Sequence, residues 1–555
     1  MLTKLCLSLV SATSLIHAAA VGDPAASSFA GATASAVYPP PGASYGAEAS
    51  YFPPASVVGY PGPTPTGDEA AAIETAPATS LMESVYPLTD PVPAGGETPD
   101  FEVIKYWGNL SPWYSVPAGA HGLPYASPQI PSGCSINQAH LLHRHGARYP
   151  TSGSGPANFA AKLHSVATTS GFKASGPLAF LATWEYRLGA EILTPFGREQ
   201  MYDLGVGFRV KYGELLKGFT QLPVFRTTSE DRMINSALNF AAGFFGAQTF
   251  QEDYYQSIII EEGGYNNTLA PSNACPTNNG PVGGIASTYE NDWIAIYLTP
   301  ALTRLSPYLP GVNLTVSDVY SMQQACAYET VALGFSEFCG LFTQAEWEGF
   351  EYSNGSDVSF WYNNGPGNPT SAAMGLGWVS ELVARLTQTQ PTEAFAETNA
   401  TLNSNPATFP VNQPIYVDAT HDTVISAILT TMNMTSFLRT GPLPTDHIPY
   451  DNSYIVSQIS PFGSNLVGQV LSCPASNVST HIRWILNDAV LPLTGIQGCP
   501  EDPNGLCALS TFISAYKQRI AEVDYNFDCY ANYTVPVPDT IVTGQFPAAL
   551  RNGTV

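Results

Sequence analysis

The sequence contains little positive charge. Its 555 residues include 20 Lys and Arg against 44 Asp and Glu, which gives a formal net charge of −24 and a sequence pI of about 4.6. Nucleic acids and anionic membrane surfaces bind basic faces, so this balance argues against both as partners. An anionic substrate would need a local basic pocket. With 44% hydrophobic residues, the chain is able to bury a large core.

Long apolar runs are also scarce. Near the N-terminus, Lys4 precedes a mostly apolar stretch at residues 5–16 and three alanines at 18–20, which predicts a secretory signal peptide over residues 1–20. A membrane anchor is the weaker alternative, because that stretch is shorter than the ~20 residues that cross a bilayer. The C-terminus has no apolar tail of the kind that signals a lipid anchor. We therefore predict a secreted protein, extracellular or in the cell wall, without a membrane anchor.

Metal-binding spacings are absent, since neither C-x-x-C nor H-x-x-x-H occurs, and we predict no metal and no cofactor. Without Cys6 of the signal peptide, eight cysteines remain, which suits four disulfides in an oxidising compartment. Spacing favours two local loops, Cys326–Cys339 and Cys499–Cys507. Nine Asn-x-Ser/Thr sequons are candidate glycosylation sites: Asn109, Asn266, Asn313, Asn354, Asn399, Asn433, Asn477, Asn532 and Asn552.

Residues 21–100 differ in composition from the rest of the chain. They are rich in Pro, Ala, Gly and Ser and contain no Lys or Arg. Such a segment buries too little apolar surface to offset its chain entropy, so we predict a disordered stalk. A spacer or pro-segment is favoured over a segment that adheres to a cell wall. Residues 101–555 form the predicted catalytic domain.

Strand and helix patterns alternate in this domain. Short strands are predicted at residues 139–143, 224–226 and 415–419, and helices at 194–212, 229–246 and 423–432. Strand–loop–helix units of this kind predict an α/β fold with active residues at strand ends. We expect a mixed, mainly parallel sheet flanked by helices, with an inserted helical cap at roughly residues 250–405.

The most informative motif is Arg144-His145-Gly146-Ala147-Arg148-Tyr149-Pro150. Two guanidiniums at the end of a strand offer forked donors that match phosphate oxygens, and they supply positive charge for phosphoryl transfer. The same charge disfavours an imidazolium, which keeps His145 neutral and nucleophilic. Gly146 would leave room for the backbone to approach a bound oxyanion. The alternative is an incidental surface patch, but five fixed positions in R-H-G-x-R-x-P rarely match by chance.

R-H-G-x-R-x-P resembles the signature of the histidine acid phosphatases, the branch of the phosphoglycerate-mutase-like fold that includes fungal phytases. The resemblance extends over residues 107–533. It implies that His145 accepts the phosphoryl group as a phosphohistidine and that Arg144 and Arg148 bind phosphate. His421-Asp422 resembles the family's second motif, in which Asp422 protonates the leaving alkoxide and His421 donates to a phosphate oxygen.

The family also has a third arginine, from a strand end between the two motifs. Arg226 matches it best by context, and Arg232 is the competitor. The resemblance further implies four disulfides: Cys134–Cys473, Cys275–Cys529, Cys326–Cys339 and Cys499–Cys507.

The sequence departs from the phytase pattern just after the catalytic loop. Fungal phytases typically place lysines there, but residues 151–158 contain no Lys or Arg. We therefore predict a metal-independent acid phosphatase of broad specificity that hydrolyses small phosphomonoesters. A phytase is the alternative. A second alternative is a non-catalytic, wall-associated protein, which the intact Arg144, His145, Arg148 and Asp422 disfavour.

Overall fold

A computed structural model describes residues 50–53, 57–59, 88, 91–96, 100–353 and 355–553. The predicted signal peptide lies outside the described residues, as does most of the predicted stalk. Within the described part of the stalk, Phe52 stacks on Tyr255 with ring centroids 4.5 Å apart. From residue 100 the chain runs into two 3-10 helices, η5 (Val103–Tyr106) and η6 (Gly108–Leu110).

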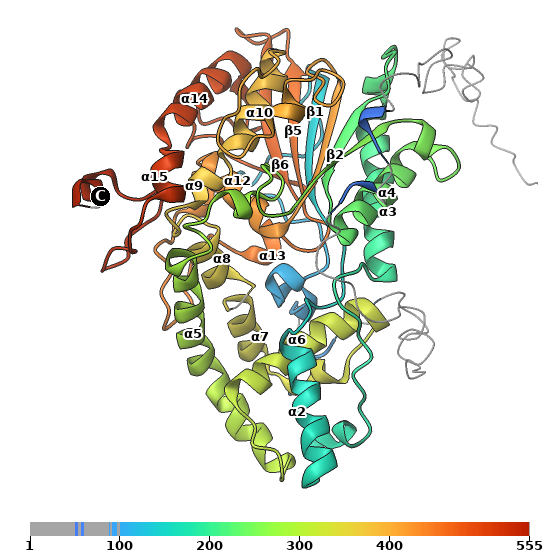
Figure 1. Cartoon of the computed structure of the whole chain (residues 1–555), viewed down its shortest axis with the longest axis vertical. Helices are drawn as coiled ribbons and strands as arrows, with labels where there is room; N and C mark the ends of the chain where they lie inside the picture. The colour runs from blue at the N-terminus through green and yellow to red at the C-terminus, as the bar shows by residue number, and fades with distance from the viewer. Residues whose placement is uncertain are drawn as a thin grey trace, which may run out of the picture.

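One mixed sheet forms the centre of the domain (Figure 1). Its strand order is β3-β2-β4-β1-β5-β6-β7, and β8 also pairs with β6. The first four strands run parallel to one another, while β5 to β8 extend the sheet with antiparallel pairs. The strands are β1 (Ser135–Arg144), β2 (Val224–Thr228), β3 (Tyr255–Ile259), β4 (Ile415–Thr420), β5 (Asn465–Ser472), β6 (Thr480–Leu486), β7 (Ala489–Val490) and β8 (Cys507–Ala508). This confirms the predicted α/β class.

Burial distinguishes the strands at the centre of the sheet. Every residue of β2 and of β4 is buried, as expected for strands covered by helices on both faces. β1 alternates between exposed and half-buried residues at its start and is fully buried from Ala139 onward. It lies between β4 on one side and β5 on the other, so the strand that leads to His145 is hydrogen-bonded along both edges.

Helices cover both faces of this sheet (Figure 1). On one face lie α3 (Pro195–Tyr212) and α4 (Asp231–Phe245), which pack aromatic side chains such as Phe208 and Phe240 against the strands. Thr194 caps α3 by accepting the N–H of Gly197, and Pro195 occupies the first turn, where its missing N–H costs nothing. The other face carries α10 (Leu376–Thr387), α12 (Asp422–Thr431) and α14 (Leu509–Glu522).

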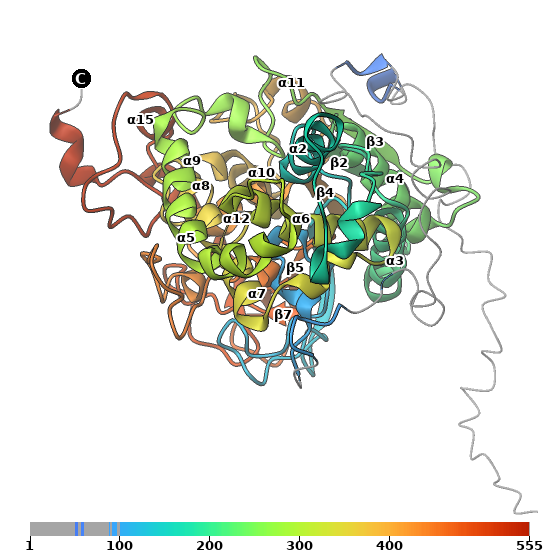
Figure 2. The same cartoon turned by 90° about the horizontal axis from the view of Figure 1, so that it is seen from below.

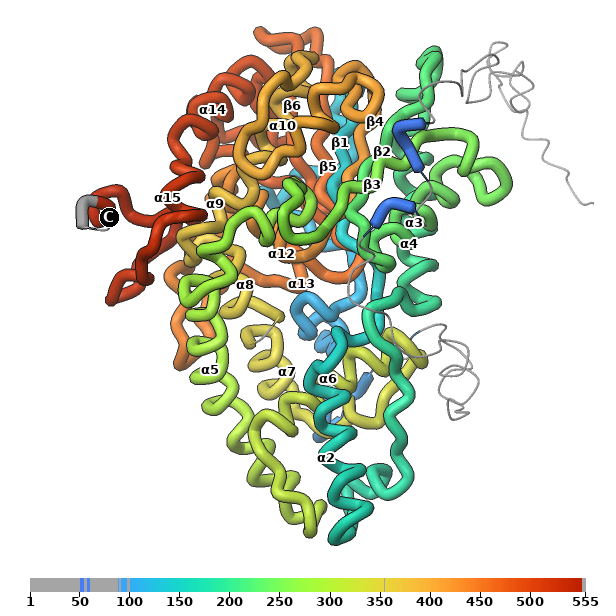
Figure 3. The backbone as a smooth tube through the Cα atoms, in the orientation of Figure 1, coloured from blue at the N-terminus to red at the C-terminus, as the bar shows by residue number. Residues whose placement is uncertain are grey.

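A helical lobe lies beyond one end of the sheet (Figures 1 and 2). It contains α2 (Gly155–Thr169), α5 (Pro281–Leu305), α6 (Val316–Leu333), α7 (Gln344–Glu351) and α8 (Asp357–Asn363). The predicted cap boundaries need correction in two respects. β3 belongs to the central sheet although it lies within residues 250–405, and α2 lies outside that range but packs on α6. The tube in Figure 3 shows α2 and α6 side by side. Shorter helices complete the fold: α9 (Ser371–Met374), α11 (Ala400–Asn403), α13 (Val456–Ile459) and α15 (Tyr525–Tyr530).

Four disulfides connect Cys134–Cys473, Cys275–Cys529, Cys326–Cys339 and Cys499–Cys507. These are the pairs that the resemblance implies. The first joins the segments flanking β1 and β5 across 339 residues of sequence. Disulfides of this number are typical of proteins that fold in an oxidising, extracellular compartment. Among the described residues, no helix is both long enough and apolar enough to cross a membrane.

Candidate active site

The carboxyl ends of four parallel strands bring polar side chains together at one edge of the sheet. His145 follows β1, Glu230 follows β2, Glu261 follows β3, and His421 follows β4. Loops at this edge of an α/β sheet are the usual place for a binding site, because they converge from strands that are adjacent in space. The strand order therefore assembles the site from segments far apart in the sequence, with 276 residues separating the two histidines.

His145 is buried, with 2% of its surface exposed. Its Nδ1 lies 2.8 Å from the carbonyl oxygen of Gly146, which holds the ring proton there and leaves Nε2 as the basic nitrogen. Burial, and then the charges of Arg144, Arg232, Arg148 and His421, lower the pKa of His145 well below its ordinary value. The imidazole is therefore neutral and has a free lone pair, as a nucleophile requires.

Arg144 and Asp422 form an ion pair, with Nη2 2.7 Å from Oδ2. The guanidinium is fully buried, donates to the backbone carbonyls of Asn109 and Ser460, and lies over the ring of Phe462 at 4.5 Å. Asn109 Nδ2 donates to the same carboxylate oxygen at 2.9 Å. This candidate glycosylation residue thus lies inside the site, where its amide orients Asp422.

Two effects act on the Asp422 carboxyl in opposite directions. Burial would raise its pKa, but Arg144, the amide of Asn109, Arg148 and the backbone N–H of Thr423 together lower it. Thr423 N–H donates to Oδ1 at 2.8 Å from the first turn of α12. In the absence of substrate the carboxyl is therefore ionised.

Arg148 and Arg232 supply further positive charge around His145. Arg148 donates to the carbonyl of Tyr149, and its pKa is raised, with burial opposed by Tyr328 on α6 and by Asp422. Arg232, in the first turn of α4, pairs with Glu191 at 3.0 Å and with Glu230. Three guanidiniums therefore surround the nucleophile.

The structure contradicts the prediction that Arg226 is the third phosphate-binding arginine. Arg226 lies on β2 within a buried ion-pair group, where it bonds to Asp418 at 2.7 Å and to Glu381 at 2.8 Å. Arg385 bonds to the same Asp418. Arg226 is not among the guanidiniums that act on His145, whereas Arg232 is. Asp418 is itself buried, with only 1% of its surface exposed.

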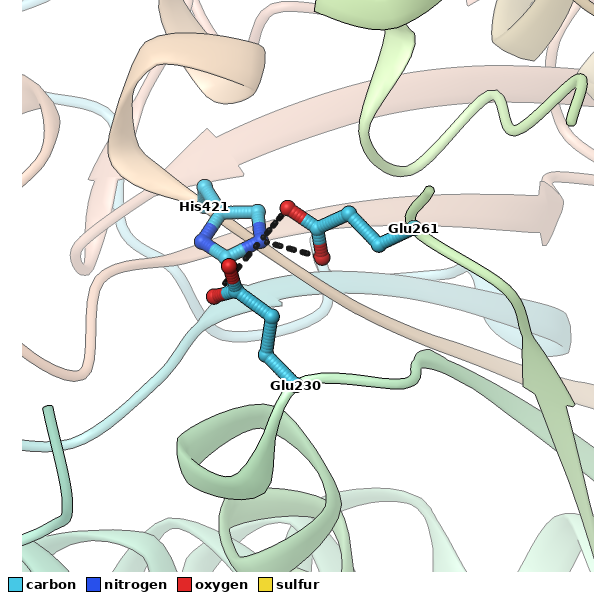
Figure 4. A group of neighbouring side chains, drawn as sticks. All are labelled: Glu230, Glu261 and His421. Atoms are coloured by element: carbon cyan, nitrogen blue, oxygen red, sulfur yellow. Dashed lines mark hydrogen bonds and ion pairs between the residues drawn. The ribbon is translucent and has the colours of Figure 1, made fainter. Parts of the chain in front are cut away.

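His421 contacts two carboxylates rather than standing alone (Figure 4). Its Nε2 lies 3.0 Å from both oxygens of Glu261 and 3.9 Å from Glu230. The ring is also 5.9 Å from that of His145, centroid to centroid. Potential ligand atoms of Glu230, Glu261 and His421 lie within 4.8 Å of one another, which is compact enough for a metal ion. Because Arg232 already brings positive charge to Glu230, we assign no metal to this group.

Gly146 has a packing role that the sequence did not predict. A Cβ at this position would lie 2.2 Å from the carbonyl oxygen of Gly197, and a Cβ at Gly197 would lie 1.9 Å from that of Ala147. The two glycines allow the N-terminus of α3 to pack directly on the catalytic loop. The close approach seen in the structure is therefore one between two backbone segments.

Sequence reasoning did not identify Asn109, Glu230 or Glu261 as site residues, and it ranked Arg232 second. Glu230 and Glu261 each follow a parallel strand by two residues, which was the available signal. It was missed for Glu261 because β3 was placed in the helical insertion. No local pattern distinguishes Asn109, whose role depends on a contact with Asp422, 313 residues further along the chain.

Comparison with known proteins gives the family. The family model of the histidine phosphatase superfamily (branch 2) matches residues 135–487. The chain belongs to this superfamily. Phytase A of Aspergillus oryzae is 33% identical over 461 residues, covering 79% of this chain and 95% of the relative. Phytase A of Aspergillus fumigatus is 32% identical over 464 residues, covering 78% and 96%.

Solved structures agree with this membership. The phytase from D. castellii superposes with a TM-score of 0.63 at 26% identity, covering 83% of this chain and 93% of that one. The multiple inositol polyphosphate phosphatase of Bifidobacterium longum, in complex with inositol hexasulfate, shares the fold alone, with a TM-score of 0.51 at 11% identity and coverage of 73% and 96%. The chain is thus a phosphoric monoester hydrolase of the histidine phosphatase superfamily.

Proposed function

We propose that the protein hydrolyses phosphomonoesters through a phosphohistidine on His145, with myo-inositol hexakisphosphate among its substrates. One observation carries this proposal. An imidazole is kept neutral by burial and then by the charges of three guanidiniums, and a carboxyl in the same pocket is bonded to one of them, Arg144. Relatives named phytase A, 32–33% identical over most of their length, support the inositol phosphate as a substrate.

In the first step, Nε2 of His145 attacks phosphorus and a P–N bond forms as the ester P–O bond breaks. The guanidiniums of Arg144, Arg148 and Arg232 stabilise the charge on the transferring phosphoryl oxygens. Asp422 gives its proton to the departing alkoxide, so the alcohol leaves neutral. The carboxyl takes up this proton from solvent at acid pH as substrate binds, because a phosphate dianion at Arg144 weakens the hold of that arginine on Asp422.

In the second step, the Asp422 carboxylate takes a proton from water, and the resulting oxygen nucleophile attacks the phosphohistidine. The P–N bond breaks, inorganic phosphate is released, and His145 returns to its neutral state. The same carboxyl thus serves as acid and then as base.

Broad specificity is the second candidate, and the entrance to the site favours it. Residues 151–158 bring no cation to the site, and Lys162, the next lysine, is paired with Asp318 across α2 and α6. Glu191, Glu230 and Glu261 add negative charge near the arginines. A ring with many phosphates would meet repulsion here that a simple ester avoids.

Two experiments test these proposals. Rapid quenching with a labelled phosphomonoester, followed by peptide mapping, is expected to place acid-labile phosphate on His145 and to find none in His145→Ala. Turnover rates for inositol hexakisphosphate, sugar phosphates and aryl phosphates at acid pH then separate a phytase from a broad acid phosphatase. Release of no phosphate from any ester would favour the non-catalytic alternative.

We also propose that the protein is secreted through the signal peptide at residues 1–20. The four disulfides and the exposed sequons at Asn266, Asn313, Asn477 and Asn532 support this route. N-terminal sequencing of the mature protein tests it, with cleavage expected close to Ala20. Whether the secreted protein remains in the cell wall is tested by fractionating wall from medium.

A further inference from the structure

We propose that Glu351, the last residue of α7, is a positioning residue that fixes Arg144 and Asp422 relative to each other. This inference rests on the proposed function and concerns the same site. Glu351 acts through two backbone segments, η6 and α13, which are far apart in the sequence and meet beside the catalytic loop. A carboxyl of the helical lobe thereby becomes part of what holds the proposed acid in place.

The carboxyl of Glu351 is shared between the two segments. Its Oε2 accepts the backbone N–H of Gly108 at 2.7 Å, and its Oε1 accepts the backbone N–H of Ser457 at 3.0 Å. Gly108 begins η6, and Ser457 lies in the first turn of α13. All three residues are buried, so water does not readily replace either hydrogen bond. One side chain thus sets the spacing between η6 and α13.

Each of the two segments also supplies a backbone carbonyl to Arg144. Asn109, in η6, accepts from Nη1 of Arg144, and Ser460, immediately after α13, accepts from the same nitrogen at 2.8 Å. The other terminal nitrogen, Nη2, pairs with Asp422 at 2.7 Å. The direction in which the guanidinium faces the carboxylate therefore depends on where η6 and α13 lie.

The same two residues hold Asp422 directly. Asn109 Nδ2 donates to the carboxylate oxygen Oδ2 at 2.9 Å, and Ser460 Oγ donates to the backbone carbonyl of Asp422 at 3.1 Å. The proposed acid and the proposed phosphate ligand thus have the same two supports. Because a misplacement of about 1 Å at reacting groups can cost about 10²-fold in rate, a change in the spacing of these supports should affect the chemical step.

Other contacts keep η6 and α13 folded without Glu351. The backbone N–H of Asn109 donates to the carbonyl of Gly355 at 3.0 Å, and the backbone N–H of Val456 donates to Asp357 Oδ1 at 2.7 Å. Each of these bonds holds one segment, whereas the carboxyl of Glu351 bonds to both. Loss of that carboxyl should therefore displace the segments relative to each other and leave the fold intact.

Glu351→Gln is the decisive variant. Burial raises the pKa of Glu351 to about 7, so at acid pH the amide has the same charge as the group it replaces. A carboxyl has an acceptor oxygen on each arm, whereas an amide has one oxygen and one NH₂ group, which cannot accept an N–H. The variant therefore removes one of the two hydrogen bonds, and it tests geometry rather than charge.

The measurement is the ratio of kcat/KM for an alkyl phosphate to kcat/KM for 4-nitrophenyl phosphate at acid pH. The alkyl ester needs a proton from Asp422 to leave, and the nitrophenyl ester needs little. We expect this ratio to fall about tenfold or more in Glu351→Gln, because the acid is misplaced. A partly unfolded or less stable protein would lower both values equally and leave the ratio unchanged.

Glu346→Gln is the matched control, because Glu346 lies on the same helix and is equally buried, at 7% exposure. Its carboxylate bonds to the backbone N–H of Thr343 and to Arg304, and neither belongs to η6 or α13. The ratio in Glu346→Gln is expected to equal that of the wild type, whatever its stability. A fall of the same size in Glu346→Gln would overturn the inference.

Two further variants complete the test. Glu351→Asp keeps both acceptor oxygens but withdraws them by one methylene, so its ratio should fall less than in Glu351→Gln. In an Asp422→Asn background, Glu351→Gln should leave the ratio unchanged. A wild-type ratio in Glu351→Gln, or in Glu351→Asp if the amide variant does not fold, would overturn the inference and leave the phosphatase proposal intact. A wild-type protein without turnover would instead refute the proposed function.

Discussion

Arg144 Nη2 lies 2.7 Å from Asp422 Oδ2, in a pocket where the arginine side chain is fully covered and the carboxylate is 13% exposed. The proposed phosphate ligand and the proposed acid are therefore bonded to each other before substrate arrives. A phosphate oxygen that binds Arg144 competes with the carboxylate for the same guanidinium. Such competition couples substrate binding to protonation of Asp422, because the group that lowers the pKa of the carboxyl is the group that the substrate engages.

Asp422→Asn is expected to separate leaving groups by their basicity. An amide cannot protonate an alkoxide, so kcat for an alkyl phosphate should fall about 10²–10⁴-fold. Transfer from 4-nitrophenyl phosphate needs little protonation of the leaving group, so the first step should survive better. Rapid-quench kinetics should then show a burst of nitrophenol and accumulated phosphohistidine. An equal loss for both substrates in the first step would contradict the acid role.

Arg232 and Arg226 provide a matched pair of substitutions with different expected effects on phosphate binding. Arg232→Ala should weaken competitive inhibition by inorganic phosphate at least tenfold, because a charged partner is lost near His145. Its free energy of unfolding should also fall, because Glu191 and Glu230 are buried and lose a partner.

Arg226→Ala should lower the free energy of unfolding by about 3–5 kcal/mol, because Asp418 and Glu381 are left with less compensation in a buried setting, but it should leave phosphate inhibition of the folded protein unchanged. Calorimetry measures the stability of each variant, and inhibition by inorganic phosphate measures the phosphate affinity of its folded fraction. Weakened phosphate affinity without lost stability in Arg226→Ala would restore the original assignment.

Asn109 should be unglycosylated although it lies in a sequon. Its Nδ2, the atom that would carry the glycan, donates to Asp422 at 2.9 Å, and the residue is only partly exposed. Glycopeptide mapping of the secreted protein should find Asn109 unmodified, while the exposed Asn313, Asn477 and Asn532 are available. Asn109→Asp would place a second negative charge beside Asp422 and should move the acid limb of kcat to higher pH. A glycan at Asn109 in active enzyme would contradict this geometry.

Stability is expected to fall from about pH 6.5 to about pH 8. Burial raises the pKa of Glu290 from 4.5 to about 8, and that of Glu329 and Glu351 to about 7. At a pH between the carboxyl's pKa in the unfolded state and its higher pKa in the folded state, only the folded protein keeps the carboxyl protonated. The free energy of unfolding therefore decreases as the pH rises. Below about pH 6.5 buried histidines act with the opposite sign, since burial lowers the pKa of His121 and His143 to about 4.

Urea unfolding of Glu290→Gln tests this linkage. The amide cannot ionise, so the free energy of unfolding should decrease less between about pH 6.5 and about pH 8 than it does in the wild type. Substitution of the exposed Glu262 by Gln serves as the control and should leave the decrease unchanged. An identical decrease in Glu290→Gln would show that this carboxyl ionises freely in the folded protein.

The elements at the catalytic edge of the sheet could be predicted from local sequence. The strand before His145 and the strand–helix unit around His421 are continuous segments whose apolar patterns predict their structure, and they appear as β1, β4 and α12. The antiparallel half of the sheet was not predicted, because β5 and β6 are defined by pairing with β1 and with each other. Their role depends on contacts across hundreds of residues.

The third phosphate-binding arginine could not be chosen correctly between Arg226 and Arg232 from the sequence, for a similar reason. A strand residue and a helix residue six positions apart differ in which face of the sheet they meet, and that depends on neighbouring side chains. Arg226 is next to Asp418 across the β2–β4 pairing, a relationship that no local pattern reveals. Arg232 lies in the first turn of α4, where the helix starts beside the catalytic loop.

Hydrogen bonding of β1 along both edges has a consequence for how specificity could change. The backbone that carries the nucleophile has no freedom to shift toward a larger or smaller ester. Adaptation to different alcohols must therefore come from the helical lobe, where α6 brings Tyr328 toward the arginines. Attempts to widen or narrow the range of accepted esters should accordingly vary α2 and α6, and leave the strand untouched.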